Sequence, residues 1–172
     1  LTAGHPLDFV RTVIPTKWEG LDAPCPKWEK FLKEIRPDDW EDSIPFLQQF
    51  YGYAMTGHGN LEKLLIAFGA TGRNGKDVSL NAIQFVLGDK IAKPIPHSVV
   101  FTSPGQRASA ANGHQAHLKA CEGVHLAVLS DASGSGDWID QVGIKERTGN
   151  TKISARGAYG KKVEEISPTW TF

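Results

Sequence analysis

The spacing of apolar residues predicts two helices early in the chain. A Pro-rich, irregular lead-in occupies residues 1–25, and from Pro26 to Ile35 the apolar residues recur three or four positions apart, as on one face of a helix. Asp39 is expected to cap a second helix that has Pro45 early in it, unless Ser43 caps a later start. The apolar residues that share a face of this second helix are Trp40, Ile44, Leu47, Tyr51 and Ala54.

Beyond residue 60 the pattern changes to short apolar runs. The run Leu64–Phe68 suits a buried parallel strand, and it leads through a Gly-rich turn into a helical pattern that ends near Leu87. Val124–Leu129 is a second run of this kind. The other predicted elements are helices over 114–121 and 138–148, a strand or a mobile loop around 98–101, and short strands over 152–154, 163–166 and 169–172. The alternation predicts an α/β fold, with a helical region over residues 1–60 followed by a second region over 61–172.

Composition excludes several classes of protein. Of the 172 residues, 40% are apolar and 22% are charged, which is typical of a folded domain rather than a disordered chain. No apolar stretch approaches the roughly 18 residues of a membrane helix. The 19 basic and 19 acidic residues balance, so overall charge favours neither a nucleic-acid binder nor a membrane-surface protein. Two distant cysteines and the absence of a secretory signal at the start indicate a cytoplasmic protein, and both chain ends indicate a fragment.

The Gly-rich turn is a candidate phosphate-binding loop. Backbone N–H groups that converge at a helix N-terminus attract anions, and Lys76 would add a mobile ammonium for the β- and γ-phosphates. The pattern departs from the usual G-x-x-x-x-G-K-[ST] at Ala70 and Asp77. The predicted nucleotide-binding residues are Ala70, Thr71, Gly72, Arg73, Asn74, Gly75, Lys76, Asp77 and Val78.

Two carboxylates are the candidate metal ligands. Asp77 stands where a Ser or Thr that binds Mg²⁺ is usual, and a carboxylate oxygen is itself a good ligand for this ion. Asp131 follows the second apolar run, where parallel-sheet nucleotide hydrolases carry an acid that binds the metal and orients water. The sequence therefore predicts Lys76 and Asp131 as catalytic residues, with ATP and Mg²⁺ as cofactors.

Local charge marks a candidate DNA-binding segment. Residues 145–162 hold six basic side chains against one acid, Glu146. Such a cluster suits DNA phosphates, although a solvated face with nothing bound has the same composition. The predicted DNA-binding residues are Lys145, Arg147, Lys152, Arg156, Lys161 and Lys162. A zinc site at His114, His117 and Cys121 is a weaker alternative, because it offers three ligands on one short helix.

Four segments in order resemble the phage and plasmid primase-helicases of helicase superfamily 3, which are related to the poxvirus primase-helicase. DDWEDSIPFLQQFYGYAMTG is similar to the helical region before the ATPase core, LLIAFGATGRNGKDVSL to the phosphate loop, and HLAVLSDAS to the second acidic motif. IKERTGNTKISARGAYGKK is similar to a third motif. Asp131 stands where the family usually has Glu, and Asn150 where an acid is common.

The resemblance implies a P-loop NTPase of AAA+-like topology, with helices on both faces of a parallel sheet and a small helical subdomain before it. It further implies an ATP-dependent DNA helicase that forms a homo-hexamer around single-stranded DNA or a DNA fork. The strand near Thr169 would lie inside the sheet, and the family's sensor residue and arginine finger would follow Phe172, so turnover by this chain is expected to be incomplete. Two rival readings stay open: a non-catalytic nucleotide-binding or ring-assembly module, and a small-molecule kinase.

Overall fold

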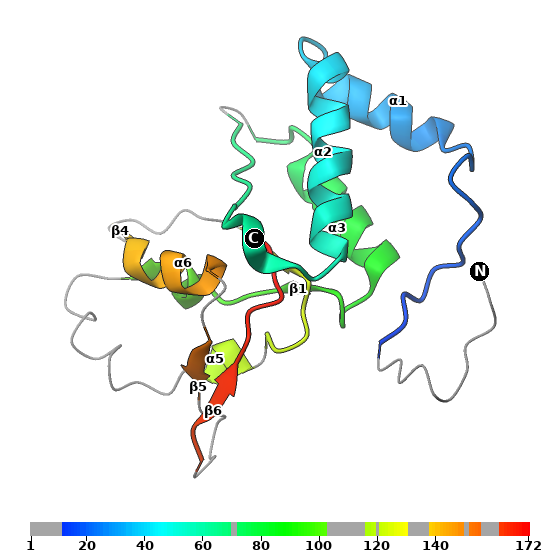
Figure 1. Cartoon of the computed structure of the whole chain (residues 1–172). Helices are drawn as coiled ribbons and strands as arrows, with labels where there is room; N and C mark the ends of the chain where they lie inside the picture. Colours follow the sequence, from blue (N-terminus) through cyan, green and yellow to red (C-terminus); the bar gives the residue numbers. More distant parts are fainter. Residues whose placement is uncertain are drawn as a thin grey trace.

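The computed structural model describes residues 12–69, 72–102, 116–119, 121–130, 138–149, 152–155 and 162–172. It has a mixed α/β fold with a small parallel sheet (Figure 1). The helices are α1 (Pro26–Ile35), α2 (Trp40–Met55), α3 (Lys76–Leu87), α5 (Ala116–Lys119) and α6 (Gln141–Thr148), with short 3-10 turns at Gly59–Leu61 and His97–Val99. The strands are β1 (Ala92–Pro94), β2 (Phe101–Thr102), β3 (Leu126–Val128), β4 (Trp138–Ile139), β5 (Ile153–Ala155) and β6 (Glu164–Ile166).

The two N-terminal helices form as the spacing predicts. Asp39 is the N-cap residue of α2, but its carboxylate accepts from Arg36 Nη1 at 3.3 Å rather than from the first turn of the helix. Pro45 lies inside α2, where it removes one backbone donor near the start of the helix. The last turn of α2 reaches the sheet, since Ala54 is buried in one cluster with Leu126 of β3. The boundary near residue 60 stays a prediction.

The parallel sheet is built from segments far apart in the sequence. β1 pairs with β3 in parallel, and Leu126 of β3 forms a parallel bridge with Thr171 on its other side. Beyond Thr171, the Leu65 amide donates to the Phe172 carbonyl at 2.8 Å. The order of segments is therefore β1, β3, residues 171–172, then Leu65. Thr171 lies between β3 and Leu65, but it forms an isolated bridge rather than the strand predicted over 169–172.

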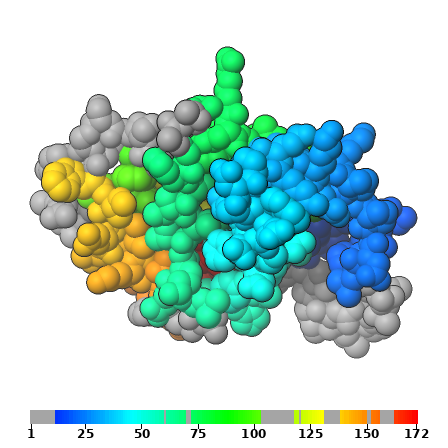
Figure 2. Space-filling view, turned by 90° about the horizontal axis from the view of Figure 1, so that it is seen from above, coloured from blue at the N-terminus to red at the C-terminus, as the bar shows by residue number. Residues whose placement is uncertain are grey.

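Two apolar clusters cover the two faces of this sheet. Leu126 and Val128 face the first cluster, which includes residues of α2 and α3. Ala127 faces the second cluster, to which α5 contributes Leu118 and the β5–β6 hairpin contributes Ile153 and Ile166. In the space-filling view, α1 and α2, in blue and cyan, lie beside the green residues that follow them, and α6 lies on the opposite side (Figure 2). Helices thus cover both faces of the sheet in the part of the chain that the structure describes.

Two other predicted elements are wrong. Leu64–Phe68 is not a buried strand, because Ile66 is 71% and Phe68 86% exposed, and a buried strand needs cover on both faces. The helix predicted from Trp138 begins only at Gln141, because the Asp140 carboxylate caps it by accepting from the Gly143 amide at 3.0 Å, while Trp138 and Ile139 pair with β2. Among the described residues, no helix has both the length and the apolar character to cross a bilayer.

Candidate functional site

The candidate phosphate loop opens helix α3. Gly75 is the N-cap residue and Lys76 is the first residue of the helix. The first backbone amides of an α-helix have no acceptor within the helix, so the start of α3 presents unpaired donors together with the positive end of the helix dipole. Of the predicted nucleotide-binding residues, Ala70 and Thr71 lie outside the described residues, and the structure describes those from Gly72 to Val78.

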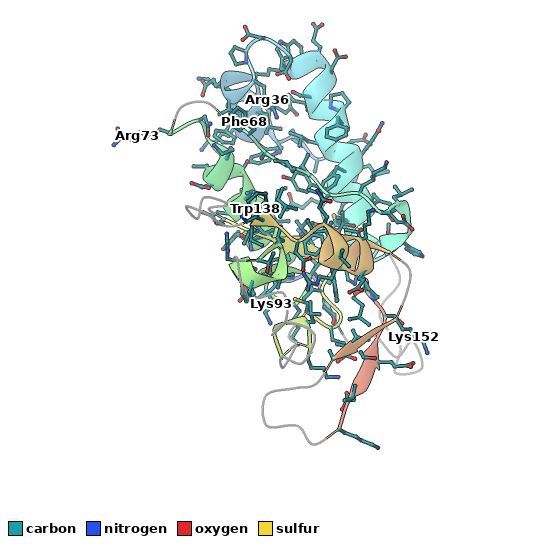
Figure 3. The ribbon with its side chains drawn as sticks, turned by 90° about the vertical axis from the view of Figure 1, so that its left-hand side faces the viewer. Arg36, Phe68, Arg73, Lys93, Trp138 and Lys152 are labelled. Atoms are coloured by element: carbon teal, nitrogen blue, oxygen red, sulfur yellow. The ribbon has the colours of Figure 1, made fainter. Side chains whose placement is uncertain are left out.

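Two residues of the loop have a left-handed backbone conformation. Arg73 has φ 60° and Gly75 has φ 78°. A left-handed conformation is strained for a residue with a Cβ and easy for Gly, so the residue before the lysine suits only Gly well. Figure 3 shows the Arg73 side chain projecting away from the body of the molecule, and Gly72 is likewise exposed.

The Lys76 ammonium lies back over the loop rather than out in solvent. Its Nζ donates to Asn74 Oδ1 at 2.8 Å. Both groups lie close to Gly69, where an added Cβ would come within 1.7 Å of Asn74 Nδ2 and 3.2 Å of Lys76 Nζ. The loop therefore brings a flexible ammonium and an amide side chain together, and a phosphate oxygen could replace the Asn74 oxygen as the acceptor.

Asp77 and Val78 occupy the first turn of α3 with exposed side chains. The Asp77 carboxylate is well placed for the helix dipole, because negative charge is stabilised at a helix N-terminus. An exposed carboxylate one residue after Lys76 also has the chemistry of a Mg²⁺ ligand. Asp131, the other predicted ligand, lies outside the described residues; the description of that segment ends at Ser130, after the buried strand β3.

The predicted DNA-binding residues do not form one exposed cluster. Lys145, Lys152 and Lys162 are exposed, whereas Arg156 and Lys161 lie outside the described residues. Lys152, which Figure 3 shows on the strand hairpin, pairs with Glu165 at 3.1 Å. Glu165 thus neutralises part of the positive charge of the basic segment, whereas Glu164, the other acid of β6, pairs with Lys119 of α5.

Arg147 is buried and bound to the protein. Its guanidinium donates to the Val99 carbonyl and lies 3.5 Å from Asp140 Oδ2. Burial lowers the pKa of Arg147, and the neighbouring Asp140 carboxylate opposes that shift. With an exposed fraction of 9%, the side chain is placed to join α6 to the turn before β2. We therefore leave Arg147 out of the DNA-binding surface proposed below.

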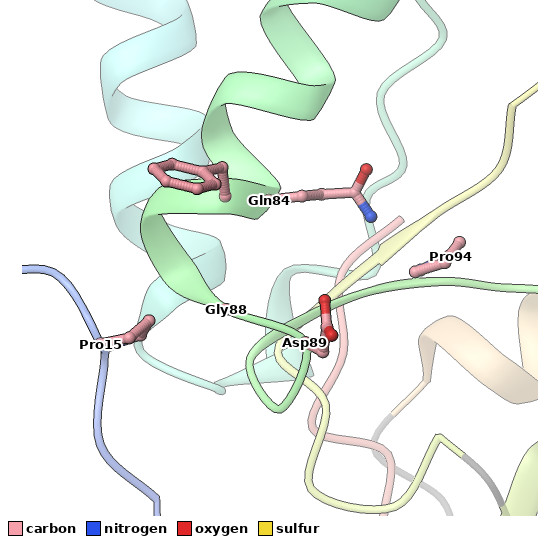
Figure 4. A pocket seen from close by; sticks show the side chains of 6 residues that line it. Pro15, Gln84, Gly88, Asp89 and Pro94 are labelled. Carbon is pink, nitrogen blue, oxygen red and sulfur yellow. The ribbon is translucent and has the colours of Figure 1, made fainter.

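The other candidate sites are weaker than the phosphate loop. No group of three or more His, Cys, Asp or Glu side chains able to hold a metal ion occurs among the residues that the structure describes. His114 and the His117 side chain, two of the three predicted zinc ligands, lie outside the described part, and Cys121 is buried. An open hollow beside the end of α3 is lined by Pro15, Gln84, Phe85, Gly88, Asp89 and Pro94 (Figure 4). It lies one helix length from Lys76 and gathers no cationic group.

Over 147 residues the chain is 30% identical to a protein of Frog virus 3 (isolate Goorha) that bears the name Putative helicase 022R. The match covers 84% of this chain and 14% of the viral protein, so the chain spans about a seventh of its relative's length. No protein-family model matches the chain. The chain is thus similar to a limited part of a large viral protein named as a helicase.

Proposed function

We propose that the chain is part of the ATPase core of a DNA helicase of the primase-helicase type, with a P-loop NTPase fold. The position of Lys76 carries this proposal. It is the first residue of α3, and its ammonium lies over the loop that opens the helix, 2.8 Å from Asn74 Oδ1. A lysine in this place is suited to the β- and γ-phosphates of a bound nucleotide.

Two further observations support the same function. The Leu65 amide, in the segment that leads into the loop, bonds to Phe172, and the neighbouring Thr171 pairs with β3, so the two sequence motifs that hold Lys76 and Asp131 meet at one small sheet. The similarity to a viral protein named as a helicase covers most of the chain. Asp131, which follows β3 by a few residues, would then hold Mg²⁺ together with Asp77 and orient the attacking water.

The DNA-binding part of the proposal uses the exposed lysines Lys145, Lys152 and Lys162, together with Arg156 and Lys161, which lie between β5 and β6 in the sequence. The β5–β6 hairpin extends from the body of the molecule at the end opposite α1 (Figure 1). A projecting basic hairpin suits contact with the phosphates of single-stranded DNA, which in the full protein would run through a ring of six subunits.

A second candidate function is supported by Asp77. Its negative charge occupies the turn of α3 that would receive a phosphate, and at about 4 Å two such charges repel by roughly 1–4 kcal/mol unless a metal ion lies between them. The site would then belong to a non-catalytic nucleotide-binding or ring-assembly module.

Equilibrium binding of ATP, with and without Mg²⁺, tests the proposal. We expect Lys76→Ala to weaken Mg-ATP binding by roughly tenfold or more, because it removes a charge-assisted hydrogen bond. The matched control is Lys90→Ala, which removes an exposed lysine at the other end of α3. Unchanged affinity in Lys76→Ala would contradict the proposal. Asp77→Ser separates the two candidates, because tighter binding in this variant indicates a decayed site and weaker Mg²⁺-dependent binding indicates a metal ligand.

A further inference from the structure

The phosphate loop packs directly against helix α1. A Cβ added at Gly75 would lie 2.5 Å from Ile35 Cγ2 and 3.2 Å from Phe31 Cζ. Ile35 is the last residue of α1, and Phe31 lies one turn before it, so both side chains are on the same face of the helix. The residue immediately before Lys76 therefore touches a helix that lies about 40 residues earlier in the chain.

The contact is held from both sides. On the loop side, Gly75 has φ 78°, and its carbonyl accepts from the Ser79 amide at 2.9 Å, which fixes it to the first turn of α3. On the helix side, Phe31 stacks on Trp28 with ring centroids 5.5 Å apart, and Leu32 is buried. Arg36, just after α1, pairs with Asp39 at the start of α2. A movement of α1 would therefore change the packing around Gly75, and a substitution at Gly75 would change the packing of α1.

We infer that Ile35 and Phe31 are positioning residues for the phosphate loop, and that they couple nucleotide binding to the packing of α1. This inference rests on the proposed nucleotide-binding function. A bound phosphate requires the backbone amides after Gly75 to be held in one arrangement. The side chains of Ile35 and Phe31 favour an arrangement in which the Gly75 backbone lies against α1. Such coupling is reciprocal, so a nucleotide that orders the loop stabilises the packing of α1 against the loop by the same factor.

Two substitutions at one position isolate the contact. Ile35→Val keeps the β-branched Cγ2 methyl that faces Gly75, whereas Ile35→Leu removes it with almost no change of volume. Hydrogen exchange of the Ser79 amide, which donates to the Gly75 carbonyl, reports the order of the loop when it is measured without nucleotide. We expect Ile35→Leu to speed this exchange roughly fivefold or more and Ile35→Val to leave it near the wild-type rate. Phe31→Leu is a second variant with the same expected direction.

Mg-ATP titration of the same variants completes the test. We expect Ile35→Leu to weaken binding by roughly fivefold or more and Ile35→Val to bind like the wild type, with unchanged far-UV circular dichroism in both. Addition of Mg-ATP to the wild type is expected to slow exchange in residues 26–35 as well as in the loop. Equal exchange and affinity in Ile35→Leu and Ile35→Val would overturn the inference while the proposed function stands. If the wild type binds no Mg-ATP, the proposed function fails, the coupling fails with it, and the exchange experiment alone decides the positioning contact.

Discussion

The Arg147 guanidinium of α6 donates a hydrogen bond to the backbone carbonyl of Val99, which lies 48 residues earlier in the chain. Asp140, the residue that caps α6, places its Oδ2 3.5 Å from the same nitrogen, Nη1, of the guanidinium. One arginine thus satisfies a buried carbonyl and a capping carboxylate together. A charged side chain in the basic segment is here part of the folded core.

Arg147→Ala is expected to destabilise the fold rather than to weaken DNA binding selectively. The substitution leaves the Val99 carbonyl and the Asp140 carboxylate without this cation, and loss of the donor to a buried carbonyl costs about 1–3 kcal/mol. Urea unfolding of Arg147→Ala and of Lys145→Ala, its exposed neighbour on α6, measures the difference. Comparable stability in the two variants would contradict this placement of Arg147.

Gly143→Ala is expected to destabilise α6. A Cβ at this position would come within 2.1 Å of Asp140 Oδ2 and 2.6 Å of Arg147 Nη1, so the capping pair would have to move. We expect a loss of about 1–2 kcal/mol in the free energy of unfolding, as for loss of a helix cap. Gly52→Ala in α2 is the matched control, because nothing lies within 4 Å of its added Cβ. There, the higher helix propensity of Ala is expected to stabilise by up to about 1 kcal/mol.

Glu165→Gln is expected to tighten the binding of single-stranded DNA. Glu165 pairs with the exposed Lys152 at 3.1 Å, and its removal frees that ammonium for a phosphate. The expected change is a modest gain in affinity at low salt and a steeper dependence of log K on log salt, by about one ion for each lysine released. Fluorescence anisotropy with a labelled oligonucleotide over a salt series measures both quantities. Glu19→Gln, which removes an exposed acid from a distant pair with Lys17, should change neither.

The two cysteines are expected to react at different rates. Cys25 is exposed, whereas Cys121 is buried, and burial raises the pKa of the Cys121 thiol. Because the thiolate is the reactive form, Cys121 should resist alkylation by iodoacetamide at pH 8 until the protein unfolds. Mass spectrometry of native and urea-treated protein tests this. The Cys121 thiol ionises at a lower pH in the unfolded chain than in the folded protein. This group therefore lowers the free energy of unfolding as the pH rises above roughly 8.5.

The local elements could be predicted because their signals are local. The period of apolar residues in α1 and α2, and the Gly-Lys pair that opens α3, are readable within a few residues of sequence. The exposure of Ile66 and Phe68 could not be predicted in this way, because burial of an apolar run depends on which segments pack on it. The burial of Arg147 has the same cause, since its partner Val99 is remote in sequence. The contact of Gly75 with α1 likewise depends on how two distant elements meet.

The candidate site also has parts that follow from local sequence and parts that depend on distant contacts. The loop from Gly72 to Lys76 is a candidate from residue types at fixed spacing, since phosphate binding depends on backbone conformation and one lysine, and its binding of phosphate stays a prediction. The DNA-binding residues were predicted from charge alone, and charge counted along the sequence does not include pairing across a hairpin. β5 and β6 pair antiparallel, with Ser154 opposite Glu165, and this register brings Glu165 beside Lys152. A charge count extended to residue 166 would have signalled this neutralisation.

The place of Thr171 in the sheet also bears on how the chain folds. It lies next to Leu126, and its neighbour Phe172 bonds to Leu65, so the interior of the sheet joins residues separated by about a hundred positions. Long loops must close before such contacts form, and chains dominated by distant pairings fold slowly. Synthesis runs from the N-terminus, so the segment around Leu65 leaves the ribosome well before its hydrogen-bonding partner exists. During that interval the backbone around Leu65 has no partner from residues 171–172 and is open to pairing with other chains, and a chaperone that shields this stretch would raise the yield of folded protein.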